Sequence, residues 1–169
     1  MIKPFSGGHP AWHTSKQEVV VLGNSMLVPL NDSRTSRGVI DYLLNMSLCS
    51  DTKLTLIHIF RKPSSGEELM GKKFMAEMPA IIEKMLADTK KRLVEEKGFS
   101  PENIKFELVN KGDASIFDGI ADYFKNSDCD TVVIGRREMS KSEEFVLGDI
   151  SVKLIRNLPG ASVLVVKTD

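Results

Sequence analysis

Residues 131–151 read TVVIGRREMSKSEEFVLGDIS. Thr131–Ile134 is apolar and β-branched, which indicates a buried strand, and the polar segment after it is bounded by Gly135 and Gly148. The residues that follow Gly148 have the spacing of a helix. A loop between a strand and a helix presents backbone N–H groups and a helix N-terminus, the two features that bind phosphate. The stretch therefore predicts an α/β fold with an anion site at the end of a strand.

The same alternation of strands and helices extends along the rest of the chain. The strands are expected at 26–30, 53–60, 104–109, 131–134 and 162–166, and the helices at about 39–46, 66–97, 113–124 and 149–157. The strands are apolar throughout and alternate strictly with helices. We therefore expect an open five-stranded parallel sheet with helices on both faces.

Two of the helices carry residues that predict local geometry. The region 66–97 contains Pro79, which should kink it or divide it into two helices. In the helix at 113–124, Asp113 is the expected N-cap. The apolar face of the region 66–97 is expected to carry Leu69, Met70, Phe74, Met78, Ile81, Met85 and Leu93.

Residues 1–25 are expected to form an N-terminal extension of a domain at 26–169. Residues 1–17 are rich in Gly, Pro, His and Ser and predict a flexible arm, whereas residues 18–22 (EVVVL) have the composition of a strand. A central strand at 26–30 would have both edges paired already. The extra strand would then pair at an outer edge, cross to another subunit or stay irregular, and the sequence does not choose among these.

The composition excludes several classes of protein. The chain has 169 residues, enough for one domain with a buried core, and carries 23 Lys plus Arg against 23 Asp plus Glu. This balance favours neither nucleic acid nor an anionic membrane as a partner. A signal-peptide pattern and an apolar run of membrane-spanning length are both absent, so we expect a cytoplasmic protein. Cys49 and Cys129 have no metal-ligand spacing and are expected to be reduced thiols.

Polar residues follow two of the predicted strands. Pro29–Ser33 follows the strand at 26–30, and Gly135–Gly148 follows the strand at 131–134. In an open α/β sheet, ligands bind at the carboxyl ends of strands where the strand order reverses. If these two strands are neighbours, both segments face one crevice, which is the predicted binding site. His58 has no partner in a catalytic spacing, so we interpret it as structural and expect no enzymatic centre.

Four stretches of the chain carry a resemblance to a known family: VPLNDS at 28–33, LIHI at 56–59, GDASIFDGIADY at 112–123 and VVIGRREMSKSEEFVLGDISVKLIRNLPGASVLVVK at 132–167. Over about residues 26–167 the chain resembles a universal stress protein domain. The resemblance implies a five-stranded parallel sheet and, in many members, ATP bound through a G-x2-G-x9-G-[S/T] loop. It also implies a homodimer joined through the last strand, Ser162–Val166, whose apolar edge would otherwise favour aggregation.

The resemblance further implies which residues hold the nucleotide. Pro29, Asn31 and Ile59 are expected to contact the adenosine, with Asn31 standing where the family usually has Asp. An amide there can still hydrogen-bond a ribose hydroxyl. The phosphate segment is expected to use Gly135, Arg137, Glu138, Gly148, Asp149, Ile150 and Ser151.

Two carboxylates change the charge of that phosphate segment. Glu138 stands at the middle glycine of the family motif, and Asp149 stands at the Ser or Thr after its last glycine. At ~4–5 Å and an effective dielectric near 20, each like-charge pair costs on the order of 3–4 kcal/mol. AMP, with fewer phosphate charges, is therefore repelled less than ATP. If ATP binds, Mg²⁺ is expected to bind with it. Asp149 has two readings, as the N-cap of the following helix or as a ligand of a divalent ion.

Three functions are compatible with these observations. The first is a cytoplasmic, homodimeric regulator that responds to a nucleotide or to a protein partner and carries out no efficient chemistry. The second is a slow ATPase, for which Glu138 and Asp149 are the local candidates for a base and a metal ligand. The third is a protein-binding module without a ligand, with the region 66–97 or the arm at 1–22 as its contact surface.

Overall fold

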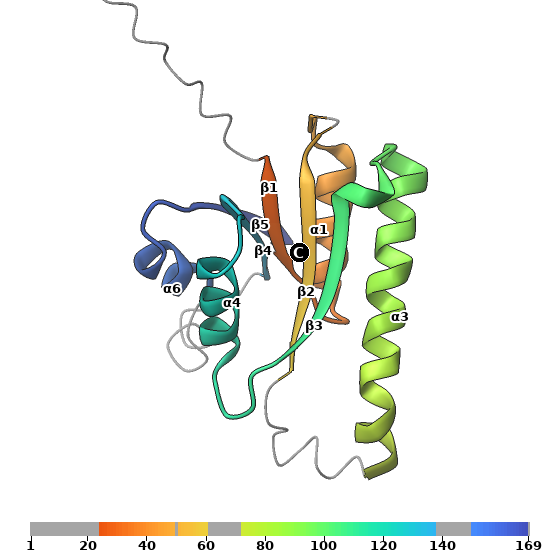
Figure 1. Cartoon of the computed structure of the whole chain (residues 1–169), viewed down its shortest axis with the longest axis vertical. Helices are drawn as coiled ribbons and strands as arrows, with labels where there is room; N and C mark the ends of the chain where they lie inside the picture. Colours follow the sequence, from red (N-terminus) through yellow and green to blue (C-terminus); the bar gives the residue numbers. More distant parts are fainter. Residues whose placement is uncertain (1–23, 50, 61–71, 138–149, 169) are drawn as a thin grey trace, which may run out of the picture.

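The computed structural model describes residues 24–49, 51–60, 72–137 and 150–168 of the chain. The strands are β1 (Ser25–Pro29), β2 (Lys53–Phe60), β3 (Ile104–Asn110), β4 (Thr131–Arg137) and β5 (Ser162–Thr168). The α-helices are α1 (Arg34–Asn45), α3 (Lys72–Lys97), α4 (Ile116–Lys125) and α6 (Ile150–Asn157), and a short 3₁₀ helix, Pro101–Asn103, precedes β3 (Figure 1).

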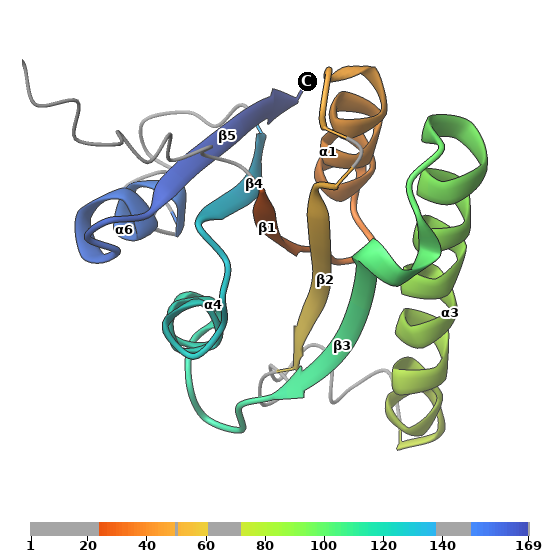
Figure 2. The same ribbon diagram turned by 45° about the horizontal axis from the view of Figure 1, so that its top comes forward.

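The five strands form one twisted sheet in the order β3-β2-β1-β4-β5 (Figure 2). All four neighbouring pairs are parallel. The predicted five-stranded parallel sheet is confirmed. β1, the first strand in the chain, is its central strand, and β3 and β5 are its two edges.

Helices cover both faces of the sheet, with α1 and α3 on one side and α4 and α6 on the other (Figure 1). Alternate residues of each strand point to opposite faces. The α1/α3 core contains Val28, Leu43, Leu56, Ile82, Leu86 and Val133, all at most 1% exposed. The α4/α6 core contains Leu27, Ile57, Ile120, Val132 and Leu154, again at most 1% exposed. Burial of apolar surface in these two cores is the main force that holds the fold together.

The long helix differs from the prediction in two ways. It is not divided at Pro79 but continues through it as one helix, because the loss of one backbone hydrogen bond is offset by packing of its apolar face on the sheet. Of that face, Leu93 is buried and Met78 and Met85 pack against the core as predicted, whereas Ile81 is 44% exposed and its neighbour Ile82 is 1% exposed in its place. Of the predicted face, residues 66–71 and the side chain of Phe74 lie outside the described residues.

Two other boundaries also differ. α4 is capped by Ser115 and not by Asp113, because Ser115 and Asp118 form a reciprocal capping box. The Ser115 hydroxyl and backbone N–H both donate to the Asp118 carboxylate, which lowers the pKa of that group. β4 runs on to Arg137, so Gly135 lies inside the strand and not in the loop. The predicted strand at 18–22 lies outside the described residues.

Candidate functional site

β1 is paired very unequally with its two neighbours. With β2 it forms five residue pairs, from Ser25–Lys53 to Pro29–Ile57. With β4 it forms only two, Met26–Thr131 and Leu27–Val132. β4 itself continues in register with β5 up to Arg137. The pairing of β1 with β4 therefore ends after Leu27, at the point where the strand order reverses. We call this separation of the two strands the split, and it is where a ligand crevice is expected.

Pro29 explains why the β1–β4 ladder stops. Along β1 the backbone groups alternate between neighbours: the Ser25 carbonyl accepts from the Asp130 N–H at 3.0 Å, whereas the Leu30 N–H donates to the Ile57 carbonyl at 2.8 Å. Odd-numbered residues of β1 therefore face β4, and Pro29 is the next one after Leu27. Because proline has no N–H, the next ladder hydrogen bond to β4 cannot form.

The turn after β1 is held by side-chain hydrogen bonds. The Asn31 N–H donates to the Ser36 hydroxyl oxygen at 2.9 Å, and that hydroxyl donates back to Asn31 Oδ1 at 2.7 Å. The Ser33 hydroxyl caps α1 by accepting from the Ser36 N–H at 3.2 Å. Since Oδ1 of Asn31 already accepts from Ser36, the amide N–H₂ is the part of Asn31 best suited to contact a ligand. The sequence interpretation missed Ser36.

His58 anchors the same turn from β2. Its Nδ1 lies 2.8 Å from the Leu30 carbonyl oxygen, and its ring packs edge-on against Phe60 with centroids 4.6 Å apart. Burial lowers the pKa of His58, while the hydrogen bond to Leu30 acts in the opposite direction and is the smaller cause. A neutral ring that donates from Nδ1 fits this geometry. The interpretation of His58 as a structural histidine agrees with these contacts.

Gly135 is required by packing, whatever else it does. A Cβ on Gly135 would lie 2.4 Å from Thr35 Cγ2, 2.9 Å from Val39 Cγ2 and 3.0 Å from the Thr35 carbonyl oxygen. The absence of a side chain therefore lets α1 lie directly on β4 and brings the first turn of α1 to the split between β1 and β4. Arg137, the last residue of β4, is exposed.

Three other predicted residues lie on the α4/α6 side of the sheet. Ile59 is 6% exposed and packs so closely on α4 that a Cβ on Gly119 would be 2.6 Å from its Cγ2. Ile150, the first residue of α6, packs against the same core. Ser151, which follows it, is 4% exposed. The predicted site residues thus lie on both faces of the sheet. The carboxyl ends of β1 and β4 lie between the two groups.

The remaining predicted residues, Glu138, Gly148 and Asp149, lie outside the described residues. Within the described ranges, no three His, Cys, Asp or Glu side chains are grouped so that they could hold a metal ion. The same ranges contain no helix long and apolar enough to cross a membrane.

Comparison with known proteins adds a family and a set of structures. The sequence model of the universal stress protein family matches residues 24–167. Among curated protein sequences, none matches at a significant level. The solved structures described next share at most 17% of residues with the chain and therefore establish likeness of fold.

Three structures illustrate that likeness. A universal stress protein in complex with cAMP has a TM-score of 0.64 and 17% identity, covering 86% of this chain and 98% of its own. UspA from Lactobacillus plantarum has a TM-score of 0.61 and 15% identity, covering 86% and 98%. A universal stress protein from Archaeoglobus fulgidus in complex with dAMP has a TM-score of 0.52 and 14% identity, covering 85% and 97%.

Proposed function

Since the chain belongs to the universal stress protein family, we propose that it is a regulatory protein that binds an adenine nucleotide between the carboxyl ends of β1 and β4. Its expected action is to report nucleotide binding to a protein partner in the cytoplasm, with no efficient chemistry of its own. Pro29, Asn31 and Ile59 would contact the adenosine. The phosphate would lie towards Gly135, Arg137 and the start of α6.

The observation that carries this proposal is the short β1–β4 ladder. Two residue pairs join these strands, against five between β1 and β2. The split lies at the switch point of the sheet, and the Asn31 turn and the first turn of α1 flank it. Pockets for nucleotides form at this place in open α/β sheets because loops from strands of opposite order diverge there.

We expect a nucleoside monophosphate to bind more tightly than ATP. Glu138 and Asp149 add two carboxylates to the part of the sequence that carries the family's phosphate motif. Their repulsion rises with the number of phosphate charges. Two of the structural neighbours were solved with monophosphates, one with cAMP and one with dAMP.

Isothermal titration calorimetry with AMP and with ATP plus Mg²⁺ tests the proposal. The wild-type protein should bind AMP, and Glu138→Gly combined with Asp149→Ser should raise the affinity for ATP by at least about tenfold because two like charges are removed. The gain for AMP should be smaller. The absence of heat with either nucleotide at high micromolar protein would overturn nucleotide binding and leave the protein-binding module as the better reading.

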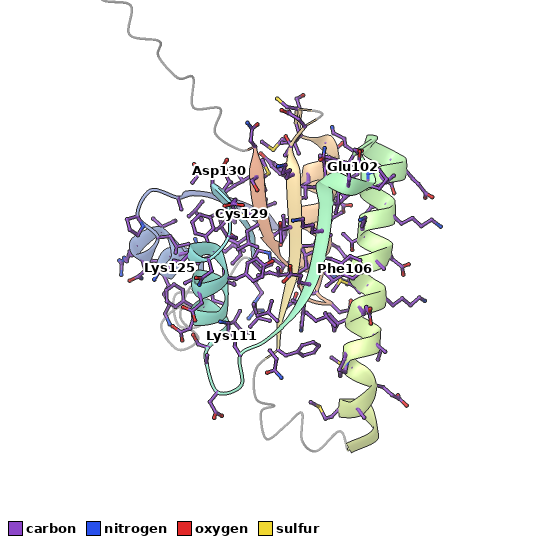
Figure 3. All side chains as sticks on the ribbon, in the orientation of Figure 1. Glu102, Phe106, Lys111, Lys125, Cys129 and Asp130 are labelled. Carbon is purple, nitrogen blue, oxygen red and sulfur yellow. The ribbon has the colours of Figure 1, made fainter. Side chains whose placement is uncertain are left out.

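A matched control removes two negative charges from the opposite end of the strands. Glu102 and Asp128 are exposed and precede β3 and β4, at the amino ends of the strands. Figure 3 labels Glu102 and Cys129, the neighbour of Asp128, at this end, with Lys111 at the other. Glu102→Gln with Asp128→Ser should leave ATP affinity unchanged. An equal gain in both double variants would mean that net charge, and not the phosphate segment, limits ATP binding.

The homodimer through β5 is the second part of the proposal. β5 is an edge strand, and its residues Val163–Val165 are only half-buried in the single chain. The Ser162 N–H donates to the Asp130 carbonyl at 2.9 Å, so by alternation the N–H of Val165 faces away from β4. Val165→Pro removes that outward donor and should convert a dimer into a monomer in sedimentation velocity, whereas Val165→Thr should not. A wild-type monomer at high concentration would refute the dimer.

A further inference from the structure

A hollow lies between α1 and α3, on one face of the sheet. It is a pocket of about 520 Å³, and its walls come from the turn after β1, from α1 and from the central part of α3. Pockets for small ligands typically measure about 300–1,000 Å³. It shares Asn31 with the proposed nucleotide site but contains none of the other predicted nucleotide contacts.

Small side chains on both helices leave the space between them unfilled at this point. Ser36 on α1 and Thr89 on α3 both line the pocket. Their hydroxyls are used within the protein, since Ser36 donates to Asn31 Oδ1 at 2.7 Å and Thr89 donates to the Met85 carbonyl at 2.7 Å. An ion pair of 2.9 Å between Arg92 and Asp41 joins α3 to α1 at one end. The middle of the pocket is therefore lined by groups that need no further hydrogen bond.

The inner surface of the pocket is apolar. Leu30 and Ile40, each 4% exposed, form its base, and Met85 adds a half-buried thioether. Ile81 also lines the pocket and is 44% exposed. It is the residue that the sequence placed wrongly on the buried face of the helix. Covering such an exposed apolar side chain with a ligand would be favourable by roughly 25 cal/mol per Å² of apolar surface buried.

The two ends of the pocket carry opposite charge. α1 and α3 each connect parallel neighbouring strands, so they run in the same direction. Lys84 lies eight residues, or about 12 Å, before Arg92 along α3, and Asp41 lies near the end of α1 beside Arg92. Lys84 is therefore level with the first turn of α1. That turn contains no acidic residue.

At this end the cations exceed the carboxylates. Arg37 is paired with Asp32 at 2.9 Å, and Lys84 and the positive end of the α1 dipole add to it. At the other end Arg92 is shared between Asp41 and Glu96, so carboxylates exceed cations there, whereas Asp88 lies midway, four residues from both Lys84 and Arg92. An anionic group is therefore favoured at the Lys84 end and disfavoured at the Arg92 end.

We propose that this pocket binds a small amphipathic organic anion, with its apolar body on Leu30, Ile40 and Ile81 and its carboxylate beside Lys84. A volume of about 520 Å³ accommodates a medium-length acyl chain or a pair of fused rings. The proposal does not require nucleotide binding, because all of the pocket's lining residues except Asn31 differ from the predicted nucleotide contacts.

Titration of the full chain with decanoate tests this site. Calorimetry should give saturable, one-to-one binding with a Kd on the order of 100 µM. Lys84→Glu should weaken decanoate binding about fivefold and leave the neutral 1-decanol unaffected, because only the charged end changes. Ile81→Asp should weaken both by at least about tenfold, because it removes apolar surface from the pocket.

Lys91→Glu is the matched control, since Lys91 lies on the same helix and does not line the pocket. It should leave decanoate binding unchanged. If Lys84→Glu lowers the melting temperature, Lys84→Gln provides the second variant. The proposal is overturned if decanoate does not saturate or if the Lys84 and Lys91 variants behave alike.

Discussion

The two sides of β1 differ in how far they are closed. Towards β2 the strand is paired along its whole length, and its side chains are buried in both cores. Towards β4 it is paired at two positions and then separates. One strand thus supplies the centre of the core on one side and an opening on the other. The difference depends on two residues. Pro29 has no N–H to pair with β4, and Gly135 has no Cβ to keep α1 away from β4.

The largest effect should come from filling the space that Gly135 leaves for α1. Gly135→Val should lower the free energy of unfolding by about 2–3 kcal/mol, because its Cβ would meet Thr35 and Val39 at distances that require α1 to move. Urea unfolding measures the change. The double variant Gly135→Ala with Thr35→Ser should be more stable than the two single effects predict, because it removes the nearest clashing methyl. Strict additivity would contradict the packing account.

A smaller effect is expected from closing the split itself. Pro29→Val restores the N–H that faces β4 and should extend the β1–β4 ladder, weakening AMP binding about tenfold. Stability should change by less than about 1 kcal/mol, because the gained hydrogen bond offsets the lost stiffness of proline. Hydrogen exchange should show Val at this position as protected.

Pro159→Val is the control for that variant, since Pro159 is exposed in the turn before β5. It should leave AMP affinity as in the wild type. Rapid exchange at position 29 together with unchanged AMP affinity would show that Pro29 does not control the split.

The smallest effect concerns pH. Burial lowers the folded-state pKa of His58 below its ordinary value of 6.5. Protonation therefore favours the unfolded chain: the stability from the neutral ring is complete above about pH 6.5 and is lost as the pH falls below it. His58→Asn keeps a donor for the Leu30 carbonyl and does not titrate. Melting temperatures measured from pH 7.5 to pH 5 should fall more steeply in the wild type, and equal slopes would contradict this assignment.

Several features of the fold could be predicted from the chain because their signals are local. The apolar strands and their alternation with helices predicted the parallel sheet. The prediction was wrong where tertiary contacts compete with local preference: α3 continues through Pro79 because its buried face holds it to the sheet, and Ser115 replaces Asp113 as cap because Asp118 completes the capping box.

The candidate site was predictable in outline and not in detail. The polar segments after two strands predicted a crevice, and strand order places those strands side by side. Gly135 was assigned to a phosphate loop, whereas the structure gives it a packing contact with α1. Ser36 and the pocket beside Ile81 have no sequence signature, since both depend on how α1 and α3 are placed.

By itself the sequence determined the α/β architecture, the family and the two carboxylates at 138 and 149, because periodicity, motif spacing and charge are properties of the linear chain. Only the tertiary structure decided that Pro29 faces β4, that the split opens after Leu27 and that α1 and α3 enclose a pocket. These features depend on which strand lies on each side of β1. The contacts concerned join residues about 30 to more than 100 positions apart in the chain, beyond the reach of any local pattern.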